Sequence, residues 1–237
     1  ANRDHSEDIL GMVAVRNFGN GLMTSRYAAS GAESEFEPGS RGRVLRNKLG
    51  IRRVGDVQQA ESEALIAVQE WAAGRFDATH RFTSDDVCEL HWRWLGEIYA
   101  WAGSYRSVNI AKGGFAFAAA AQVPRLMAKF SHNELAKETP CTDMDAPRLA
   151  RALARTHAEM ILIHPFREGN GRCARLLAYL MALQAGQPSL DTSLFAGRGK
   201  RAYVGAIHAA LSSDYALLQQ LFADAIKRTA SWYRASP

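Results

Sequence analysis

Residues 164–175 read His-Pro-Phe-Arg-Glu-Gly-Asn-Gly-Arg-Cys-Ala-Arg, and this stretch joins two apolar segments with a helical pattern, 150–163 and 173–185. Its centre, Gly169-Asn170-Gly171, can turn tightly and expose backbone N–H groups at the start of the second helix. The first N–H groups of a helix lack partners and the helix dipole is positive there, so such an end binds anions. The stretch therefore predicts two helices that meet at an anion-binding corner.

Four side chains around this corner suit nucleotide chemistry. Arg172 and Arg175 carry forked donors that match phosphate oxygens. Glu168 supplies a hard oxygen ligand for Mg²⁺ beside a nucleotide, and a histidine, His164, suits proton removal from a hydroxyl. The alternative is a glycine-capped helical corner with a solvated arginine face. We favour a nucleotide site for phosphoryl-group chemistry because these residue types fall together at fixed offsets.

The same stretch resembles the signature of the Fic family, His-Pro-Phe-x-Asp/Glu-Gly-Asn-Gly-Arg-x-x-Arg, at every specified position. A match of this length is far more specific than a lone glycine motif. The resemblance implies the family's all-α fold, a helical bundle with a short β-hairpin flap. It also implies a protein adenylyltransferase, which uses Mg²⁺, transfers AMP from ATP to a Ser, Thr or Tyr hydroxyl of a target protein, and releases pyrophosphate.

The resemblance assigns roles to the polar motif residues. His164 matches the base that deprotonates the target hydroxyl, which attacks the α-phosphate, and Glu168 matches the acid that holds Mg²⁺ between the α- and β-phosphates. Arg175 matches the arginine that reaches the terminal phosphate. The expected nucleotide-binding residues are Gly169, Asn170, Gly171, Arg172 and Arg175.

Three further motif positions are expected to have no chemical role. Phe166 matches the aromatic residue that anchors the loop in the core, and Pro165 is expected to be structural through its fixed φ. Arg167 occupies the family's unspecified position and is expected to face solvent.

Residues 108–117 break the helical pattern. Val-Asn-Ile and Phe-Ala-Phe flank Lys-Gly-Gly, which predicts two short strands around a glycine turn. In the Fic family this hairpin is the flap, whose edge pairs with an extended target segment through main-chain hydrogen bonds. The alternative is an ordinary surface hairpin, and Lys112 either contacts a phosphate or is solvated. The expected target-binding residues are Val108, Asn109, Ile110, Lys112 and Gly113.

The resemblance to the family extends beyond the motif, over residues 41–228. The further similar segments lie at 45–51, 98–103, 108–114 and 203–207. We therefore expect a Fic domain over 41–237, preceded by an N-terminal extension of unknown role over 1–40. The Gly-, Ser- and Glu-rich segment 31–42 is expected to be a linker.

Helical periodicity runs through most of the remaining chain. The predicted helices span residues 60–73, 84–101, 123–137, 147–163, 172–185, 200–211 and 213–230. The second of these carries several aromatic residues, which we expect in the core rather than in a base-stacking surface. They are Trp92, Trp94, Tyr99 and Trp101.

Composition limits the class of protein. With 237 residues, of which 47% are hydrophobic, the chain can bury one sizeable core. No run approaches the roughly 18 apolar residues of a membrane span, so we expect no membrane partner. Cys88, Cys141 and Cys173 are odd in number and widely spaced, which favours reduced thiols. We expect a location in the cytoplasm, or secretion into a host cytoplasm as an effector.

The net charge is +5, and basic residues are densest in 41–53, where no acidic residue occurs. A solvated loop or helix edge is the favoured interpretation of this run, and a landing site for an acidic partner is the alternative. Basicity of this density does not require nucleic acid, so we do not expect a nucleic-acid partner.

Other functions fit the sequence less well. The motif binds phosphates and cannot choose the base, so a Fic-fold transferase that uses another nucleotide, such as UTP, stays open. A Doc-like phosphotransferase departs from the motif in the Gly-Asn-Gly region, and this chain does not. A non-enzymatic basic binding module would have a decayed motif, whereas His164 and Glu168 are both present.

Many Fic proteins carry an inhibitory helix, Ser/Thr-x-x-x-Glu-Gly/Asn, whose glutamate pairs with the second motif arginine. In this chain only Glu168 is followed by glycine or asparagine, and it belongs to the motif itself. We therefore expect any restraint to come from a separate antitoxin-like partner, from a diverged inhibitory helix within residues 1–40, or from oligomerisation.

Overall fold

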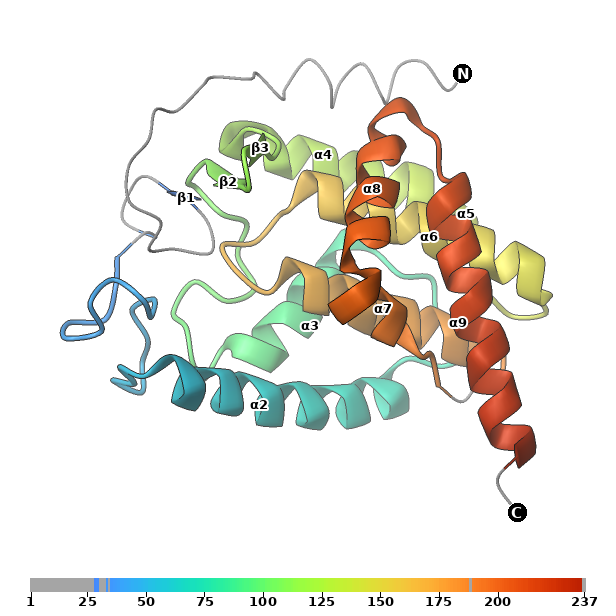
Figure 1. The fold of residues 1–237 in the computed structure, drawn as a ribbon, viewed down its shortest axis with the longest axis horizontal. Coiled ribbons are helices and arrows are strands. Elements are labelled where there is room, and N and C mark those ends of the chain that lie inside the picture. The colour runs from blue at the N-terminus through green and yellow to red at the C-terminus, as the bar shows by residue number, and fades with distance from the viewer. Residues whose placement is uncertain (1–27, 30–32, 34, 188, 236–237) are drawn as a thin grey trace.

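The structure, a computed structural model, describes residues 28–29, 33, 35–187 and 189–235 of the chain (Figure 1). The helices are α2 (Val54–Arg75), α3 (Ser84–Leu95), α4 (Val123–Phe130), α5 (Ala136–Glu138), α6 (Ala146–Ile163), α7 (Asn170–Gln184), α8 (Lys200–Ala209) and α9 (Ala216–Ala235). The strands are β1 (Ala28–Ala29), β2 (Ile110–Lys112) and β3 (Phe115–Ala116). The expected fold class, all-α with a short β-hairpin, is confirmed.

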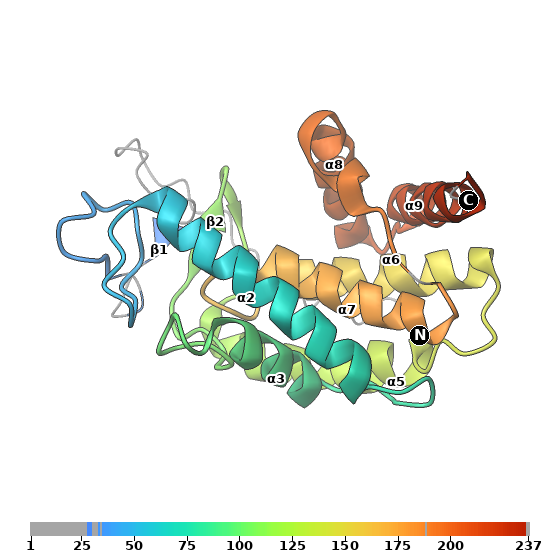
Figure 2. The same cartoon turned by 90° about the horizontal axis from the view of Figure 1, so that it is seen from below.

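Helix α6 lies at the centre of the bundle. Asp145 caps its start by accepting a hydrogen bond from the backbone N–H of Arg148 at 2.9 Å, and Pro147 fits its first turn. The helix packs against α7, α9 and α4. Figure 2 shows α2 and α3 on one side of the α6–α7 pair, with α8 and α9 on the other. The two helices that flank the motif are therefore supported from both sides.

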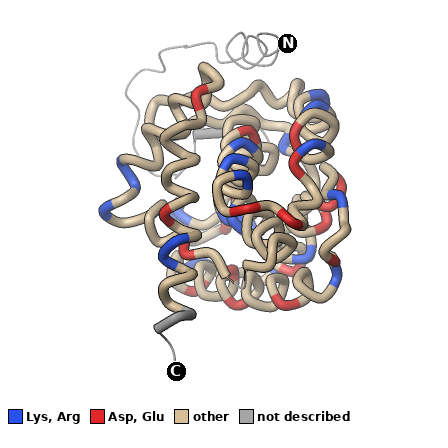
Figure 3. Tube along the Cα trace, turned by 90° about the vertical axis from the view of Figure 1, so that its right-hand side faces the viewer, with Lys and Arg blue, Asp and Glu red and all other residues tan. Residues whose placement is uncertain are grey.

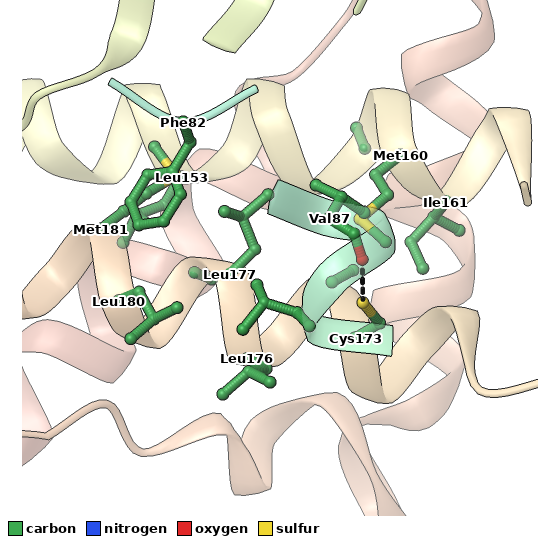
Figure 4. Packing of buried hydrophobic residues seen from close by; sticks show 14 of the residues in the cluster. Phe82, Val87, Leu153, Met160, Ile161, Cys173, Leu176, Leu177, Leu180 and Met181 are labelled. Carbon is green, nitrogen blue, oxygen red and sulfur yellow. Dashed lines mark hydrogen bonds between the residues drawn. The ribbon is translucent and has the colours of Figure 1, made fainter. Parts of the chain in front are cut away.

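The core between α3, α6 and α7 is closely packed (Figure 4). Phe82, Val87 and Met181 are almost completely buried. Cys173, in the second turn of α7, is also buried, and its sulfur lies 3.9 Å from the Val87 carbonyl oxygen of α3. Burial of apolar side chains is the main favourable contribution to folding. Here it fixes the first turns of α7, and with them the motif, against α3.

Helix α3 begins where predicted and ends earlier than predicted. Thr83 and Asp86 cap its start reciprocally, since each side chain accepts a hydrogen bond from the other's backbone N–H. The expected helix over 84–101 stops at Leu95. Lys48 binds the chain just beyond this end: its Nζ donates to the Gly96 carbonyl oxygen at 2.5 Å, and its backbone N–H donates to the Ile98 carbonyl oxygen at 2.8 Å. Lys48 thus supplies partners for two carbonyl groups that no continuing helix satisfies.

The expected burial of the aromatic residues is correct for Trp94 and Tyr99 and wrong for Trp92. Trp92 is 51% exposed, whereas Trp94 and Tyr99 are buried and Trp101 is partly buried. Residues two positions apart on a helix point to different faces, so Trp92 and Trp94 cannot both face the core.

The remaining predicted helices agree with the structure to within a few residues, with two exceptions. Helix α2 starts at Val54, earlier than expected. The single helix expected over 123–137 is divided into α4 and α5 by a π-helical turn at Ser131–Leu135. The hydroxyl of Ser131 in that turn accepts a hydrogen bond from the backbone N–H of Ser84 at the start of α3.

The basic run over 41–53 forms an exposed loop, which agrees with its interpretation as solvated. Arg46 pairs with Glu35 at 3.5 Å and Arg53 with Asp56 at 3.8 Å. Figure 3 shows basic and acidic residues interspersed along the described chain. None of the helices within the described residues is long and apolar enough to cross a lipid bilayer.

The segment over 31–42, expected to be a linker, packs on the helical body where the structure describes it. The backbone N–H of Glu37 donates to the Val44 carbonyl oxygen at 2.8 Å, and Ser40 is buried. Glu33 bonds to Ser107 and Arg167, as described below. The linker prediction is therefore wrong for these residues, because composition alone does not reveal such bonds.

Candidate active site

The motif loop connects α6 to α7 and contains two left-handed backbone positions. His164 ends α6 with φ of 53° and ψ of 61°. Gly169 precedes α7 with φ of 83°. A Cβ at Gly169 would lie 2.7 Å from a ring carbon of Trp94, so conformation and space both require glycine here. The tight turn starts α7 at Asn170 and forms the helix end that the sequence predicts to bind anions.

Asn170 closes this loop from within. Its Oδ1 accepts a hydrogen bond from the backbone N–H of Phe166 at 2.8 Å, and its Nδ2 donates to the Phe166 carbonyl oxygen at 2.8 Å. The side chain is fully buried. Asn170 is expected from the sequence to bind nucleotide, and the structure adds that both ends of its side-chain amide bond the loop.

Phe166 anchors the loop through His91 of α3. Phe166 is fully buried, and its ring stacks on the His91 ring with centroids 3.8 Å apart. The Nδ1 of His91 accepts from the backbone N–H of Gly103 at 2.9 Å, so Nε2 carries the proton and donates to the Glu168 carbonyl oxygen at 3.0 Å. Burial lowers the pKa of His91 to about 3, so the ring is neutral at pH 7. The sequence offers no signal for this role of His91.

His164, the predicted base, is buried at the junction of α6 and the flap. Its Nδ1 lies 3.0 Å from the Ile161 carbonyl oxygen, which can only accept, so Nδ1 carries the proton and Nε2 the lone pair. Its ring stacks on Phe117 with centroids 3.7 Å apart. Burial lowers the pKa of His164 to about 3, against the raising effect of the Ile161 carbonyl. The imidazole is therefore neutral near pH 7, as a base must be.

Arg106 links the flap to the motif loop. The guanidinium is buried and donates to the carbonyl oxygens of His164 at 2.7 Å, Val108 at 2.8 Å and Ala118 at 2.5 Å. Its backbone N–H donates to the Pro165 carbonyl oxygen at 2.9 Å. Burial lowers the pKa of Arg106 to about 10, so the group stays charged at pH 7. The sequence did not identify Arg106, because its partners are backbone atoms that leave no side-chain pattern.

Glu168 and Arg172 lie together at the start of α7. Glu168 Oε1 accepts from the backbone N–H of Gly169 at 3.1 Å and lies 3.7 Å from Arg172 Nη2. Arg172 Nη1 donates to Glu61 Oε2 of α2 at 2.7 Å. The side chain of Glu168 is 13% exposed and that of Arg172 21% exposed, so both can be reached from solvent. Glu61 was not expected, because no motif connects it to this loop.

Arg175 lies one turn further along α7 and turns back toward the helix start. A Cβ at Gly171 would lie 3.6 Å from Arg175 Nη1, an ordinary contact distance. His157 and Tyr203 are also near. Burial lowers the pKa of His157 and the charge of Arg175 lowers it further, whereas burial raises the pKa of Tyr203 and the charge of Arg175 partly offsets that rise. The structure thus brings Arg172, Arg175 and the first N–H groups of α7 to one helix end.

The flap is a two-stranded hairpin, as predicted. Ala111 of β2 pairs with Ala116 of β3, and the turn uses Gly113 and Gly114 at φ of 57° and 83°. Val108 and Ile110 are buried against Phe117, whereas Lys112 is exposed. Asn109 Oδ1 accepts from the backbone N–H of Ala120 at 2.9 Å. A role of these residues in target binding stays a prediction.

The outer edge of β2 is already paired within the chain. Ala28 and Ala29 of β1 lie antiparallel to it, opposite Ala111 and Ile110 respectively. The β1 strand falls within residues 1–40, the predicted extension of unknown role. That extension therefore contacts the flap at the edge where the sequence predicts an extended target segment.

Arg167 is buried, so the expectation that it faces solvent is wrong. It is 1% exposed, and its Nε donates to the Glu33 carbonyl oxygen at 2.9 Å. The carboxylate of Glu33 accepts from the hydroxyl of Ser107 at 2.9 Å and from the Ser107 backbone N–H. The N-terminal segment covers Arg167 at this point, and nothing in the motif indicates that contact.

Within the described ranges, no group of three or more His, Cys, Asp or Glu side chains is arranged to hold a metal ion by itself. Glu168 is one carboxylate beside a predicted phosphate site. Mg²⁺ commonly binds one or two carboxylates together with substrate phosphates, so a single glutamate fits a nucleotide-bound Mg²⁺.

Comparison with known proteins gives the same family as the motif. Residues 81–182 match the Fic/DOC family. The chain is 31% identical over 143 residues to protein adenylyltransferase VbhT of Bartonella schoenbuchensis, across 60% of this chain and 30% of that protein. It is 25% identical over 189 residues to the probable protein adenylyltransferase Fic of Escherichia coli, across 77% of this chain and 88% of that protein. The match thus spans less than a third of VbhT.

Solved structures share the fold. BepC, a VirB-translocated effector protein of Bartonella tribocorum solved with bound AMPPNP, aligns with a TM-score of 0.62 and 20% identity. The alignment covers 76% of this chain and 91% of that chain. At this identity the likeness shows the fold alone. The matched residues, 81–182, contain α3, the flap, α6 and the motif, and this part of the chain therefore belongs to the Fic/DOC family.

Proposed function

We propose that this chain is a protein adenylyltransferase, which transfers AMP from ATP to a Ser, Thr or Tyr hydroxyl of a target protein and releases pyrophosphate. The observation that carries the proposal is the neutral His164, whose Nδ1–H bonds Ile161, in the loop that leads into the arginine-bearing start of α7. The names of relatives at 25–34% identity, all protein adenylyltransferases, support the same activity.

The helix end suits a nucleoside triphosphate. Gly171 carries no side chain, and a Cβ there would meet only Arg175 Nη1 at 3.6 Å, so phosphate oxygens can approach the backbone N–H groups of the first turn of α7. Arg172 and Arg175 add forked donors for further phosphate oxygens. Glu168 would hold Mg²⁺ between the α- and β-phosphates. Bound Mg²⁺ supplies positive charge that stabilises the negative charge developing on the transferred phosphate.

The proposed reaction is a single displacement at the α-phosphorus. The target hydroxyl gives its proton to Nε2 of His164 while its oxygen forms a bond to the α-phosphorus. The bond from the α-phosphorus to the oxygen that bridges to the β-phosphate breaks, and pyrophosphate leaves. Arg172 and the N–H groups of α7 stabilise charge on the α-phosphate oxygens, and Arg175 binds the terminal phosphate. The product is an AMP ester of the target side chain.

The low pKa of His164 is consistent with this role. A pKa of about 3 keeps the ring neutral and able to accept a proton, but also makes it a weak base. Nearby negative charge favours the imidazolium form. The charge of a bound triphosphate would therefore raise the pKa of His164 and strengthen it as a base only when substrate is present.

The proposed partner is a protein with a hydroxyl side chain in an extended segment. Such a segment can pair with the flap through main-chain hydrogen bonds. The outer edge of β2 carries Ala28 and Ala29 of the same chain, so a target must displace β1 or pair along β3. Lys112 is exposed at the tip of β2, where it can contact either solvent or a phosphate.

We retain residues 41–237 as the Fic domain and residues 1–40 as an extension that contacts the flap. For restraint of the enzyme we still favour a separate antitoxin-like partner over an element within residues 1–40 or oligomerisation. A chain that begins at Gly39 tests this choice, because it lacks β1. Transfer equal to that of the full chain supports a separate partner, and strong activation contradicts it. We propose a location in the cytoplasm, or in a host cytoplasm after secretion.

The test is incubation of the chain with a cell lysate, Mg²⁺ and each α-³²P-labelled nucleoside triphosphate in turn, followed by mass spectrometry of the labelled protein. The proposal expects label from ATP on a Ser, Thr or Tyr residue, and none with a His164→Ala variant. Label from UTP alone would mean that the chain transfers a nucleotide to protein but uses UTP instead of ATP. Absence of label from every nucleotide would contradict the proposed function.

A further inference from the structure

Glu61 lies outside the motif, yet it contacts a motif arginine. It occupies a buried position on α2 and is 4% exposed. Its Oε2 accepts from Arg172 Nη1 at 2.7 Å, across 111 positions of sequence. A buried carboxylate is costly unless it is paired and hydrogen-bonded. The Arg172 guanidinium supplies the opposite charge and the hydrogen bond that the buried Glu61 carboxylate needs.

The second oxygen of the same carboxylate is also held. Glu61 Oε1 accepts from the Tyr99 hydroxyl at 2.7 Å. Burial and the neighbouring charge of Glu61 raise the pKa of Tyr99 above its usual range, so the hydroxyl keeps its proton and donates. The Tyr99 ring stacks on Trp101 with centroids 4.5 Å apart. Rotation of the Glu61 carboxylate would break one or both of these bonds.

Trp94 supports the guanidinium from a different direction. The Cζ of Arg172 lies 4.6 Å from the centre of the Trp94 ring, a cation–π distance. The indole N–H of Trp94 donates to the backbone carbonyl oxygen of Glu61 at 2.7 Å, and the same ring packs against Gly169 of the motif turn. One indole thus connects α2, Arg172 and the start of α7.

We propose that Glu61 is a positioning residue, which fixes the Arg172 guanidinium before nucleotide binds in the orientation that the transfer step uses. The inference rests on the proposed adenylyltransferase function. A guanidinium has five N–H donors, and the bond to Glu61 uses Nη1, so Nη2 and Nε can donate to phosphate oxygens. An arginine held in advance needs little reorganisation when charge develops in the transition state. Glu61 acts through Arg172 and touches no reacting atom.

Glu61→Gln is the first test, because glutamine keeps the size and the oxygen that Tyr99 needs but removes the charge that holds Arg172. We expect kcat for AMP transfer to fall about 10- to 100-fold, the scale of a displaced catalytic group. The KM for ATP should change less than about three-fold, since the effect lies in the transition state. Glu63→Gln is the matched control, on the same helix and exposed, and should transfer AMP at the wild-type rate.

The second measurement asks whether Glu61 acts through Arg172. In an Arg172→Ala background, Glu61→Gln should lower kcat less than about two-fold further, because the group that Glu61 orients is gone. A fully multiplicative loss would overturn the inference. A Glu61→Gln variant more active than wild type would also overturn it, because Glu61 would then restrain Arg172. If Glu61→Gln does not fold, Tyr99→Phe replaces it, with an expected loss of about two- to five-fold that disappears in the Arg172→Ala background.

The third measurement does not depend on activity. Nuclear magnetic resonance of ¹⁵N-labelled arginine should show separate Nη1 and Nη2 signals for Arg172, because the bond to Glu61 hinders rotation of the guanidinium. The two signals should merge in Glu61→Gln and stay separate in Glu63→Gln. Merged Arg172 signals in the wild-type chain would overturn the inference. If the Arg172 signals are separate but the chain transfers no nucleotide, the proposed function is contradicted. The Glu61–Arg172 bond itself would still be supported by the separate signals.

Discussion

The substitution Gly169→Ala tests the tight packing of the motif turn. An added Cβ would lie 2.7 Å and 3.0 Å from two Trp94 ring carbons and 3.2 Å from Leu95 Cδ1, and the backbone has φ of 83°. A left-handed conformation costs an alanine roughly 1–2 kcal/mol. An extra methyl group in packed surroundings costs about 1–3 kcal/mol more. We therefore expect the free energy of unfolding to fall by about 2–5 kcal/mol.

Gly171→Ala is the matched control, two residues away in the first turn of α7. Its added Cβ would meet only Arg175 Nη1, at 3.6 Å, and helical alanine is more stable than glycine by roughly 0.5–1 kcal/mol. The two substitutions should therefore change stability in opposite directions. Urea denaturation followed by circular dichroism measures both free energies. The melting temperature of the Gly169→Ala chain should lie about 4–20 °C below that of the wild type. A Gly169→Ala chain as stable as wild type would refute the described turn.

Three further predictions concern the base, the flap and acid stability. His164→Ala should leave the chain folded and lower AMP transfer by about 10²–10⁴-fold; near-wild-type turnover of the purified variant would contradict the assignment of His164 as the base. Arg106→Met removes the bonds between the flap and the motif loop, so hydrogen exchange in the flap should quicken and target modification should fall more than ATP binding; unchanged flap exchange would argue against this linkage. Burial lowers the pKa of His91, His157 and His164 to about 3, so below the ordinary value of 6.5 the unfolded chain binds more protons than the folded one. The stability from these histidines is complete above pH 6.5 and is lost as pH falls toward 3; urea unfolding between about pH 7.5 and pH 4.5 measures it, and a flat profile would contradict the buried, neutral histidines.

The sequence predicts the parts of this protein that depend on local pattern. Helix α6 follows from its apolar periodicity and from Pro147 in its first turn, and the flap follows from Val-Asn-Ile and Phe-Ala-Phe on either side of a glycine turn. The corner between α6 and α7 follows from residues 164–175, because glycine at position 169 permits the positive φ that the turn requires.

Contacts between distant segments are not predictable in the same way. Glu61 and Arg172 are separated by 111 positions, and a glutamate on α2 resembles any other surface glutamate until the fold is known. Glu61 does not fit the inhibitory motif either, because that motif has glycine or asparagine after its glutamate and Glu61 is followed by Ser62. Arg106 bonds backbone carbonyl groups, which every residue possesses. The roles of Glu61 and Arg106 are visible only in the tertiary structure.

The errors have the same origin. Arg167 was expected in solvent because the motif leaves its position unspecified, and the contact that buries it comes from Glu33, far away in sequence. Trp92 was expected in the core because aromatic residues are usually buried, but its place on α3 directs it away from Trp94. Composition describes an average residue, whereas each of these side chains depends on a particular neighbour.

The central claim is that AMP is the group transferred and that His164 is the base. The most direct measurement incubates the purified chain with an unlabelled target protein, in parallel reactions with α-³²P-ATP and γ-³²P-ATP. Each reaction is carried out with the wild-type chain and with His164→Ala. The account predicts that wild type leaves the α-label on the target and releases the γ-label as pyrophosphate, and that His164→Ala leaves neither. Retention of the γ-label on the target would identify a phosphotransferase, and equal α-labelling by His164→Ala would remove His164 as the base; either result would contradict the account.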